Sequence, residues 1–66
     1  MKLNNKISVL YVDDEPQNLA AFKANFRKIF NVSVANDATE AFAIINSAHI
    51  NVVITDRMMP DITGAD

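Results

Sequence analysis

The sequence predicts an α/β protein whose strands and helices alternate in the order β-α-β-α-β around a parallel sheet. The first and last predicted strands are nearly continuous runs of apolar, β-favouring residues, as expected where helices cover both faces of a sheet. Two stretches with the apolar spacing of helices lie between the strands. Right-handed crossovers would then place the first and third strands side by side, in the strand order 2-1-3.

The first strand is predicted over Ile7–Val12, where Tyr11 is expected to pack, and three acids follow at once. Pro16 suits the first turn of a helix, because its missing N–H would have no intrahelical partner there. A helix is therefore predicted from Pro16 to Phe30, ending at Asn31. The residues expected on its apolar face are Leu19, Phe22, Phe26, Ile29 and Phe30.

The rest of the chain supplies a second strand, a second helix and a third strand. The second strand is predicted over Val32–Ala35, and Asp37 with Glu40 three positions later resembles a capping box at the start of a helix. The third strand is predicted over Ile50–Thr55 and ends at Asp56. The residues expected to face inward from the second helix are Ala38, Ala41, Phe42 and Ile45.

Length and composition narrow the functions that the chain could have. Its 66 residues allow one domain with a marginal core. Six Lys and Arg against eight Asp and Glu give a net charge of −2 without a basic run, so neither nucleic acid nor a membrane surface is an expected partner. Cysteine is absent, and no apolar run approaches the roughly 20 residues of a membrane span. We expect a soluble, cytoplasmic protein.

The acids after the first and third strands are the candidate site. Ligands of open α/β sheets bind at the carboxyl ends of the strands, and adjacent first and third strands would bring Asp13, Asp14 and Asp56 together. Clustered carboxylates repel one another unless a hard cation is present, and oxygen ligands suit Mg²⁺ or Mn²⁺. Simpler interpretations are an acidic first helical turn for Asp13 and Asp14, and a helix or turn cap for Asp56.

These residues resemble the response-regulator receiver domain of two-component signalling, in its chemotaxis-regulator-like form. The resemblance lies in VDDEP at residues 12–16, in Asp56 at the end of an apolar strand, and in Met-Pro at 59–60 followed by Gly64. It implies a flavodoxin-like three-layer α/β/α receiver fold, truncated to β-α-β-α-β with parallel strand order 2-1-3. Residues 1–66 would form one partial receiver domain, the N-terminal half, with three strands and two helices.

The resemblance also implies a role for each matching residue. Asp56 would be the phosphoacceptor, taking a phosphoryl group from a histidine kinase or phosphotransfer protein to give an acyl phosphate. Asp14 would be a direct ligand of Mg²⁺ or Mn²⁺, Asp13 a ligand directly or through water, and Met58 a ligand through its backbone carbonyl. Such a domain is a phosphoprotein and not an enzyme.

The sequence departs from the receiver pattern in one respect that leaves other functions open. Receivers also use a Ser or Thr from the fourth strand and a Lys from the fifth, which would lie beyond Asp66, so the resemblance implies impaired phosphoryl transfer. An alternative is a non-signalling, self-associating module, a homodimer formed through the exposed third strand. A Mg²⁺-dependent phosphohydrolase is a third possibility, but the sequence contains no Gly-rich phosphate loop.

Overall fold

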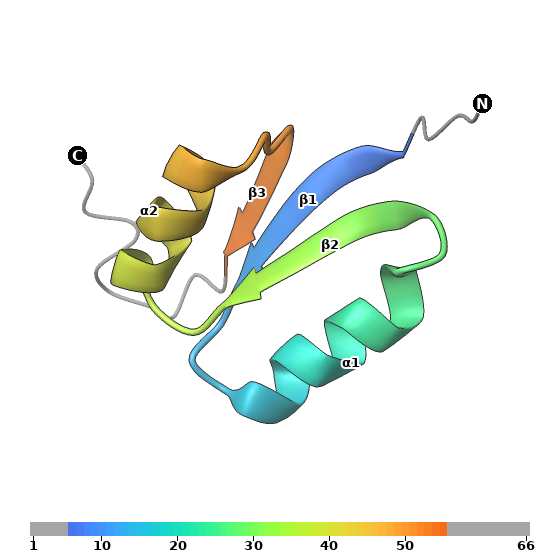
Figure 1. Cartoon of the computed structure of the whole chain (residues 1–66). Helices are drawn as coiled ribbons and strands as arrows, with labels where there is room; N and C mark the ends of the chain where they lie inside the picture. Colours follow the sequence, from blue (N-terminus) through green and yellow to red (C-terminus); the bar gives the residue numbers. More distant parts are fainter. Residues whose placement is uncertain (1–5, 56–66) are drawn as a thin grey trace.

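The computed structural model describes residues 6–55, and the elements follow one another in the predicted order (Figure 1). The three strands form one parallel sheet in the order β2-β1-β3. The predicted fold class and strand order are therefore confirmed. The elements are β1 (Ile7–Val12), α1 (Pro16–Phe26), β2 (Phe30–Ala35), α2 (Ala38–Ser47) and β3 (Val52–Thr55).

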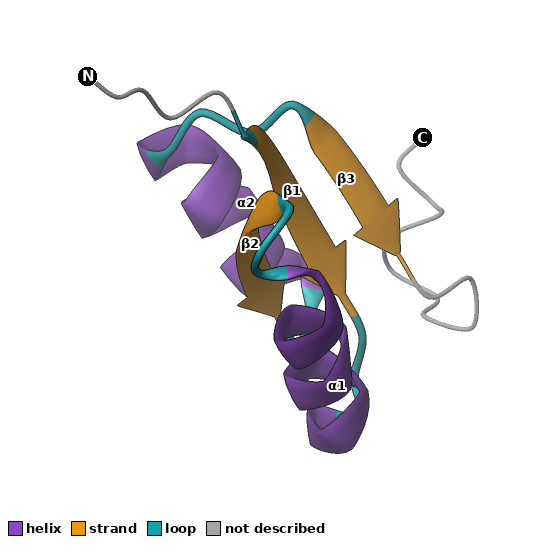
Figure 2. Cartoon of the chain, turned by 90° about the vertical axis from the view of Figure 1, so that its right-hand side faces the viewer, coloured by secondary structure: helices purple, strands orange, loops and turns teal. Residues whose placement is uncertain are grey.

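The two helices cover opposite faces of the sheet, α1 on one side and α2 on the other (Figure 2). This follows from topology, because two right-handed crossovers that run in opposite directions along a sheet place their helices on different faces. Side chains alternate along β1, so Tyr11 contacts Phe22 of α1 while Leu10 faces α2. The main buried cluster lies on the α2 side and consists of Leu10, Val12, Ala35 and Ala41, with Ile44 and Ile50 packed against it. Val9 is buried as well, on the α1 side of β1.

Helix α1 is shorter than predicted, and the second strand begins earlier. The helix ends at Phe26, residues 27–29 turn, and β2 begins at Phe30, which pairs with Ile7 of β1. Aromatic residues at 26 and 30 fit one face of a longer helix equally well, so the sequence spacing was ambiguous. Pairing with β1 decides the boundary, and it leaves Ile29 59% exposed instead of buried.

Helix α2 begins as predicted but turns a different face to the sheet. Asp37 is its N-cap, and the Asp37 Oδ1 accepts a hydrogen bond from the Glu40 amide at 2.8 Å. The Glu40 carboxylate accepts from the Asn36 amide at 2.7 Å, one residue before the position of a standard capping box. Ala41 is buried as expected, whereas Phe42 and Ile45 are 56% and 39% exposed, so their predicted burial was wrong.

Strand β3 begins at Val52, two residues later than predicted, because the side chain of Asn51 takes part in the sheet edge. The Asn51 amide donates to the Ser8 carbonyl, and the Asn51 Oδ1 accepts from the Ser8 amide, both at 2.9 Å. The side-chain oxygen thus replaces a backbone carbonyl at the start of the β1–β3 ladder. Within residues 6–55, no helix is long and apolar enough to cross a membrane.

Candidate functional site

The candidate site lies where β1 ends and the chain turns into α1. The Asp13 amide donates to the Ala35 carbonyl at 3.1 Å, which continues the β1–β2 ladder one residue beyond Val12. The Asp13 Oδ1 accepts from the Glu15 amide at 3.0 Å, a local side-chain turn that redirects the backbone toward Pro16. Helix α1 begins at Pro16 without an acid in its first turn, so the acids precede the helix and do not form its first turn.

Asp13 is a buried carboxylate, 2% exposed, and three donors reach it. Besides the Glu15 amide, the Tyr11 hydroxyl donates to Oδ2 at 2.6 Å and the Asn18 side-chain amide donates to the same oxygen at 3.0 Å. The Tyr11 hydrogen bond is the main reason why the pKa of Asp13 is lowered. Burial opposes it, and the Glu15 amide, the Asn18 side chain and the Asp14 amide assist it. The group is therefore held as a carboxylate, the form that can bind a cation.

Asp14 has a contrasting environment. Its side chain is exposed, and no hydrogen bond from elsewhere in residues 6–55 reaches it. Adjacent acids at one strand end thus differ in kind: Asp13 is fixed by the protein, and Asp14 can turn toward a ligand. Carboxylate oxygens of both types suit a hard divalent cation, so these residues fit the predicted Mg²⁺ or Mn²⁺.

The other predicted site residues, Asp56 and Met58, lie outside the described residues. The structure does fix the strand that precedes Asp56: β3 ends at Thr55, which pairs with Val12, the residue before Asp13. In the part of the chain that the structure covers, no group of three His, Cys, Asp or Glu side chains is placed to hold a metal. The described portion of the predicted site therefore consists of Asp13 and Asp14.

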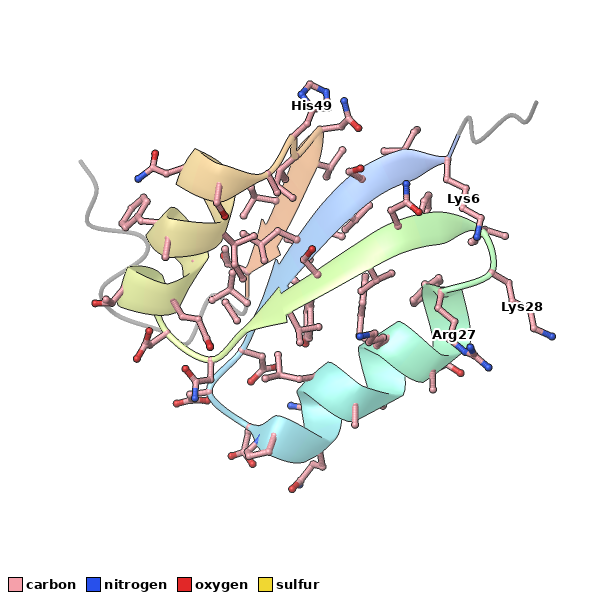
Figure 3. The ribbon with its side chains drawn as sticks, viewed as in Figure 1. Lys6, Arg27, Lys28 and His49 are labelled. Carbon is pink, nitrogen blue, oxygen red and sulfur yellow. The ribbon has the colours of Figure 1, made fainter. Side chains whose placement is uncertain are left out.

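Basic side chains lie at the other end of the sheet. Lys6, Arg27 and Lys28 gather around the start of β1 and the end of α1, and His49 lies before β3 (Figure 3). The Lys6 Nζ donates to the Arg27 carbonyl at 3.2 Å. Because Lys6 precedes β1 and Asp13 follows it, Lys6 and its neighbours Arg27 and Lys28 lie at the opposite end of β1 from the acids.

Sequence reasoning missed two residues of this site, Tyr11 and Asn18. Tyr11 was assigned to packing alone, and no role was predicted for Asn18. A signal for Tyr11 was present, because residues two apart on a strand share a face, and Tyr11 is two positions before Asp13. For Asn18, the contact depends on where α1 lies over the sheet, and the sequence does not specify that placement.

Residues 9–66 match the family model described as the response regulator receiver domain. The chain therefore belongs to the response regulator receiver domain family, and the predicted resemblance is confirmed.

Several curated proteins are similar over nearly the whole chain. The transcriptional regulatory protein TrcR of Mycobacterium tuberculosis is 37% identical over 91% of the chain, which spans 24% of that protein. The sensor protein EvgS of Escherichia coli O157:H7 is 32% identical over 94% of the chain, and the hydrogenase transcriptional regulatory protein HoxA of Cupriavidus necator is 30% identical over 96%. The chain spans only 5% and 13% of those two proteins. No solved structure gives a significant match.

Proposed function

We propose that this receiver is a phosphoacceptor in two-component signalling and that Asp56 takes a phosphoryl group from a histidine kinase or phosphotransfer protein. The observation that carries the proposal is the strand register: Val12 and Thr55 are paired, and each is followed in the sequence by an acid, Asp13 and Asp56. Membership of the receiver family and similarity to a sensor protein and to transcriptional regulators support it. A cytoplasmic location is part of this proposal.

The chemistry assigned to the chain is attack by an Asp56 carboxylate oxygen on phosphorus. A P–O bond forms, the P–N bond to the donor histidine breaks, and its electron pair stays on the imidazole nitrogen, so the product is an acyl phosphate. Asp13, Asp14, Asp56 and the Met58 carbonyl would hold Mg²⁺, which when bound neutralises charge on the transferring group. Asp13 and Asp14 would contribute negative charge to the metal site at the end of β1. Lys6, Arg27 and Lys28 lie at the other end of the strand, where they cannot pair with these two carboxylates.

Intact-mass spectrometry after incubation with phosphoramidate and Mg²⁺ tests the phosphoacceptor. We expect a minor fraction of the 66-residue chain to gain one phosphoryl group, since the sequence lacks the Ser or Thr and the Lys that the receiver resemblance implies. Asp56→Asn should abolish the adduct, and Asp61→Asn, a nearby acid, should not. An adduct that survives in Asp56→Asn would contradict the assignment, and a stoichiometric adduct would contradict the expected impairment.

Thermal melting with and without Mg²⁺ tests the metal site. A ligand that binds only the folded chain stabilises it by about 2.7 kcal/mol at a hundredfold excess over Kd. We expect millimolar Mg²⁺ to raise the melting temperature of the wild type and of Glu15→Gln, the matched exposed acid, but not of Asp14→Asn or Asp56→Ala. Equal shifts in all four chains would show that Mg²⁺ binds elsewhere.

A second proposal concerns self-association, and the exposure of β3 favours it. Val52, Val53 and Ile54 are 44%, 46% and 39% exposed, and within residues 6–55 β3 pairs only with β1. The Asp13 amide bonds to β2, so Leu10 faces β3, and in the β1–β3 register its partners are the Val52 carbonyl and the Ile54 amide. The Val53 amide therefore points to the unpaired edge. We propose a two-fold homodimer in which the β3 strands of two copies pair antiparallel.

Light scattering coupled to size exclusion separates this dimer from a monomer. Val53→Pro removes an edge donor and should give a folded monomer, whereas Val53→Ile keeps the donor and should remain dimeric. A folded wild-type monomer at micromolar concentration would refute the dimer. A dimer that persists in Val53→Pro would show that another surface forms the interface.

A further inference from the structure

Tyr11 brings its hydroxyl into the acidic site from the α1 face of the sheet. It lies two residues before Asp13 on β1, so both side chains project to that face, and the hydroxyl oxygen is 2.6 Å from the Asp13 Oδ2. A hydroxyl bonded to a carboxylate at this distance is a short, charge-assisted hydrogen bond. Tyr11 therefore does more than fill space beneath the helix.

The ring that carries this hydroxyl is held by α1. Tyr11 and Phe22 are stacked, with centroids 4.3 Å apart and planes 8° from parallel. Phe22 in turn contacts Phe26, the last residue of the helix, with centroids 4.7 Å apart. Because a stacked ring has little freedom to tilt, the position of α1 determines where the Tyr11 hydroxyl lies.

The same helix supplies a second donor to the same oxygen. The Asn18 amide, in the first turn of α1, donates to the Asp13 Oδ2 at 3.0 Å, and the Glu15 amide donates to Oδ1 at 3.0 Å. A carboxylate oxygen offers two lone pairs. Oδ2 therefore accepts from two side chains of the protein, whereas Oδ1 accepts only the Glu15 amide among these bonds, so Oδ1 has the greater remaining capacity for a cation or for a water bound to it.

We propose that Tyr11, together with Asn18, is a positioning residue of the metal site, which fixes the Asp13 carboxylate so that Oδ1 is the oxygen presented to the cation. The proposal rests on the divalent-cation site proposed above. It gives the aromatic stack between β1 and α1 a function at the site, because partners that orient a ligating carboxylate commonly govern metal affinity.

The test compares removal of the hydroxyl with removal of the stack. Tyr11→Phe keeps the ring and loses the hydroxyl, and Phe22→Leu keeps the hydroxyl and loses the aromatic partner. By calorimetry on the 66-residue chain, we expect Mn²⁺ to bind about tenfold more weakly to Tyr11→Phe and to Asn18→Ala than to the wild type. Phe22→Leu should lower the melting temperature more than Tyr11→Phe does, with a smaller loss of Mn²⁺ affinity.

NMR of the metal-free chain tests the positioning role of Tyr11 independently of whether the chain binds a metal. The Asn18 side-chain amide shares Oδ2 with Tyr11, so its NMR signals should move in Tyr11→Phe and stay in place in Ser47→Ala, which loses a remote hydroxyl. Unmoved Asn18 signals together with an unchanged Mn²⁺ dissociation constant in Tyr11→Phe would overturn the positioning role and leave the metal site standing. A wild-type chain that binds no Mn²⁺, with Asn18 signals that do move, would overturn the metal site and with it the function assigned to Tyr11.

Discussion

At the scale of single residues, Asp13 shows how a buried charge is tolerated in a small protein. Burial alone would favour the neutral acid, and an isolated buried carboxylate is costly. Three hydrogen bonds, from Tyr11, Glu15 and Asn18, reverse that preference and lower the pKa of Asp13. The carboxylate stays charged next to a water-exposed acid, Asp14, without a described cation beside it.

The lowered pKa of Asp13 predicts how stability depends on pH. A group whose pKa is lower in the folded state stabilises the fold above its unfolded pKa, which is about 3.9 for Asp, and loses that contribution as pH falls through the folded value. We expect urea midpoints, measured in chelator from pH 6 to pH 2, to fall more steeply below about pH 4 in the wild type than in Tyr11→Phe. Parallel curves would mean that the Tyr11 hydroxyl does not stabilise the charged form.

Asp37 carries a second prediction at this scale. Its carboxylate satisfies the Glu40 amide, one of the donors that a helix N-terminus leaves without an intrahelical partner. Asp37→Ala should destabilise the chain by about 1 kcal/mol in chemical denaturation, whereas Asp37→Ser, which can still cap, should cost only a fraction of that. Equal losses for the two variants would show that charge, and not capping, is what Asp37 contributes.

At the scale of elements, an aromatic row joins α1 to both strands beside it. Tyr11 of β1 contacts Phe22, Phe22 contacts Phe26, and Phe26 contacts Phe30 of β2 with centroids 6.0 Å apart. The helix has no fully buried residue, so these partly exposed rings are its main attachment to the sheet. The row therefore joins the end of α1 to the first residue of β2.

Phe26 is the residue at which this attachment can be measured. It takes part in two aromatic pairs, each of which contributes roughly 0.5 to 1.5 kcal/mol beyond burial. We expect Phe26→Leu to lower the free energy of unfolding by about 1 to 2 kcal/mol. Ile29→Ala, on the apolar face predicted from the sequence but 59% exposed, should change it by less than about 0.5 kcal/mol. A loss of more than about 0.5 kcal/mol in Ile29→Ala would indicate that Ile29 is buried in solution, as the helix predicted to Phe30 requires.

At the scale of the whole molecule, the core of residues 6–55 is small, and all of it except Val9 lies on the α2 face of the sheet. The cluster on that face is formed by Leu10, Val12, Ala35 and Ala41, whereas Phe42 and Ile45 of α2 remain exposed. Typical stability of 0.05 to 0.15 kcal/mol per residue gives roughly 3 to 10 kcal/mol for a chain of this length. The loss of one large core side chain is therefore comparable to the entire stability.

Leu10 of β1 is the residue at which the weight of the core can be tested, because its side chain is fully buried on the α2 side of the sheet. Leu10→Ala should cost about 2 to 5 kcal/mol and leave much of the chain unfolded at room temperature, as read by circular dichroism. Ile45→Ala removes a side chain of similar size from α2, but Ile45 is 39% exposed, so this variant should remain mostly folded. Similar losses at the two positions would imply that the Ile45 face is covered in solution.

The amino-acid patterns alone predict the fold class, the strand order and the start of α2, and the structure confirms all three. Apolar runs identify strands covered on both faces, the handedness of crossovers fixes the strand order, and Asp37 with Glu40 encodes a cap within four residues. The same logic placed Asp13 and Asp14 in the candidate site, since acids that follow a parallel strand lie at its ligand-binding edge.

The end of α1, the buried face of α2 and the donors that hold Asp13 depend on contacts between elements, which the sequence pattern does not specify. Phe26 and Phe30 satisfy a helical pattern, and pairing of Phe30 with Ile7 overrides it. The bond from Asn18 to Asp13 requires α1 to lie at a particular height over β1, and such a height is set by the packing of rings such as Phe22. Periodicity specifies what each segment becomes, but the contacts between segments depend on register and on helix placement, which arise only when the whole sheet is assembled.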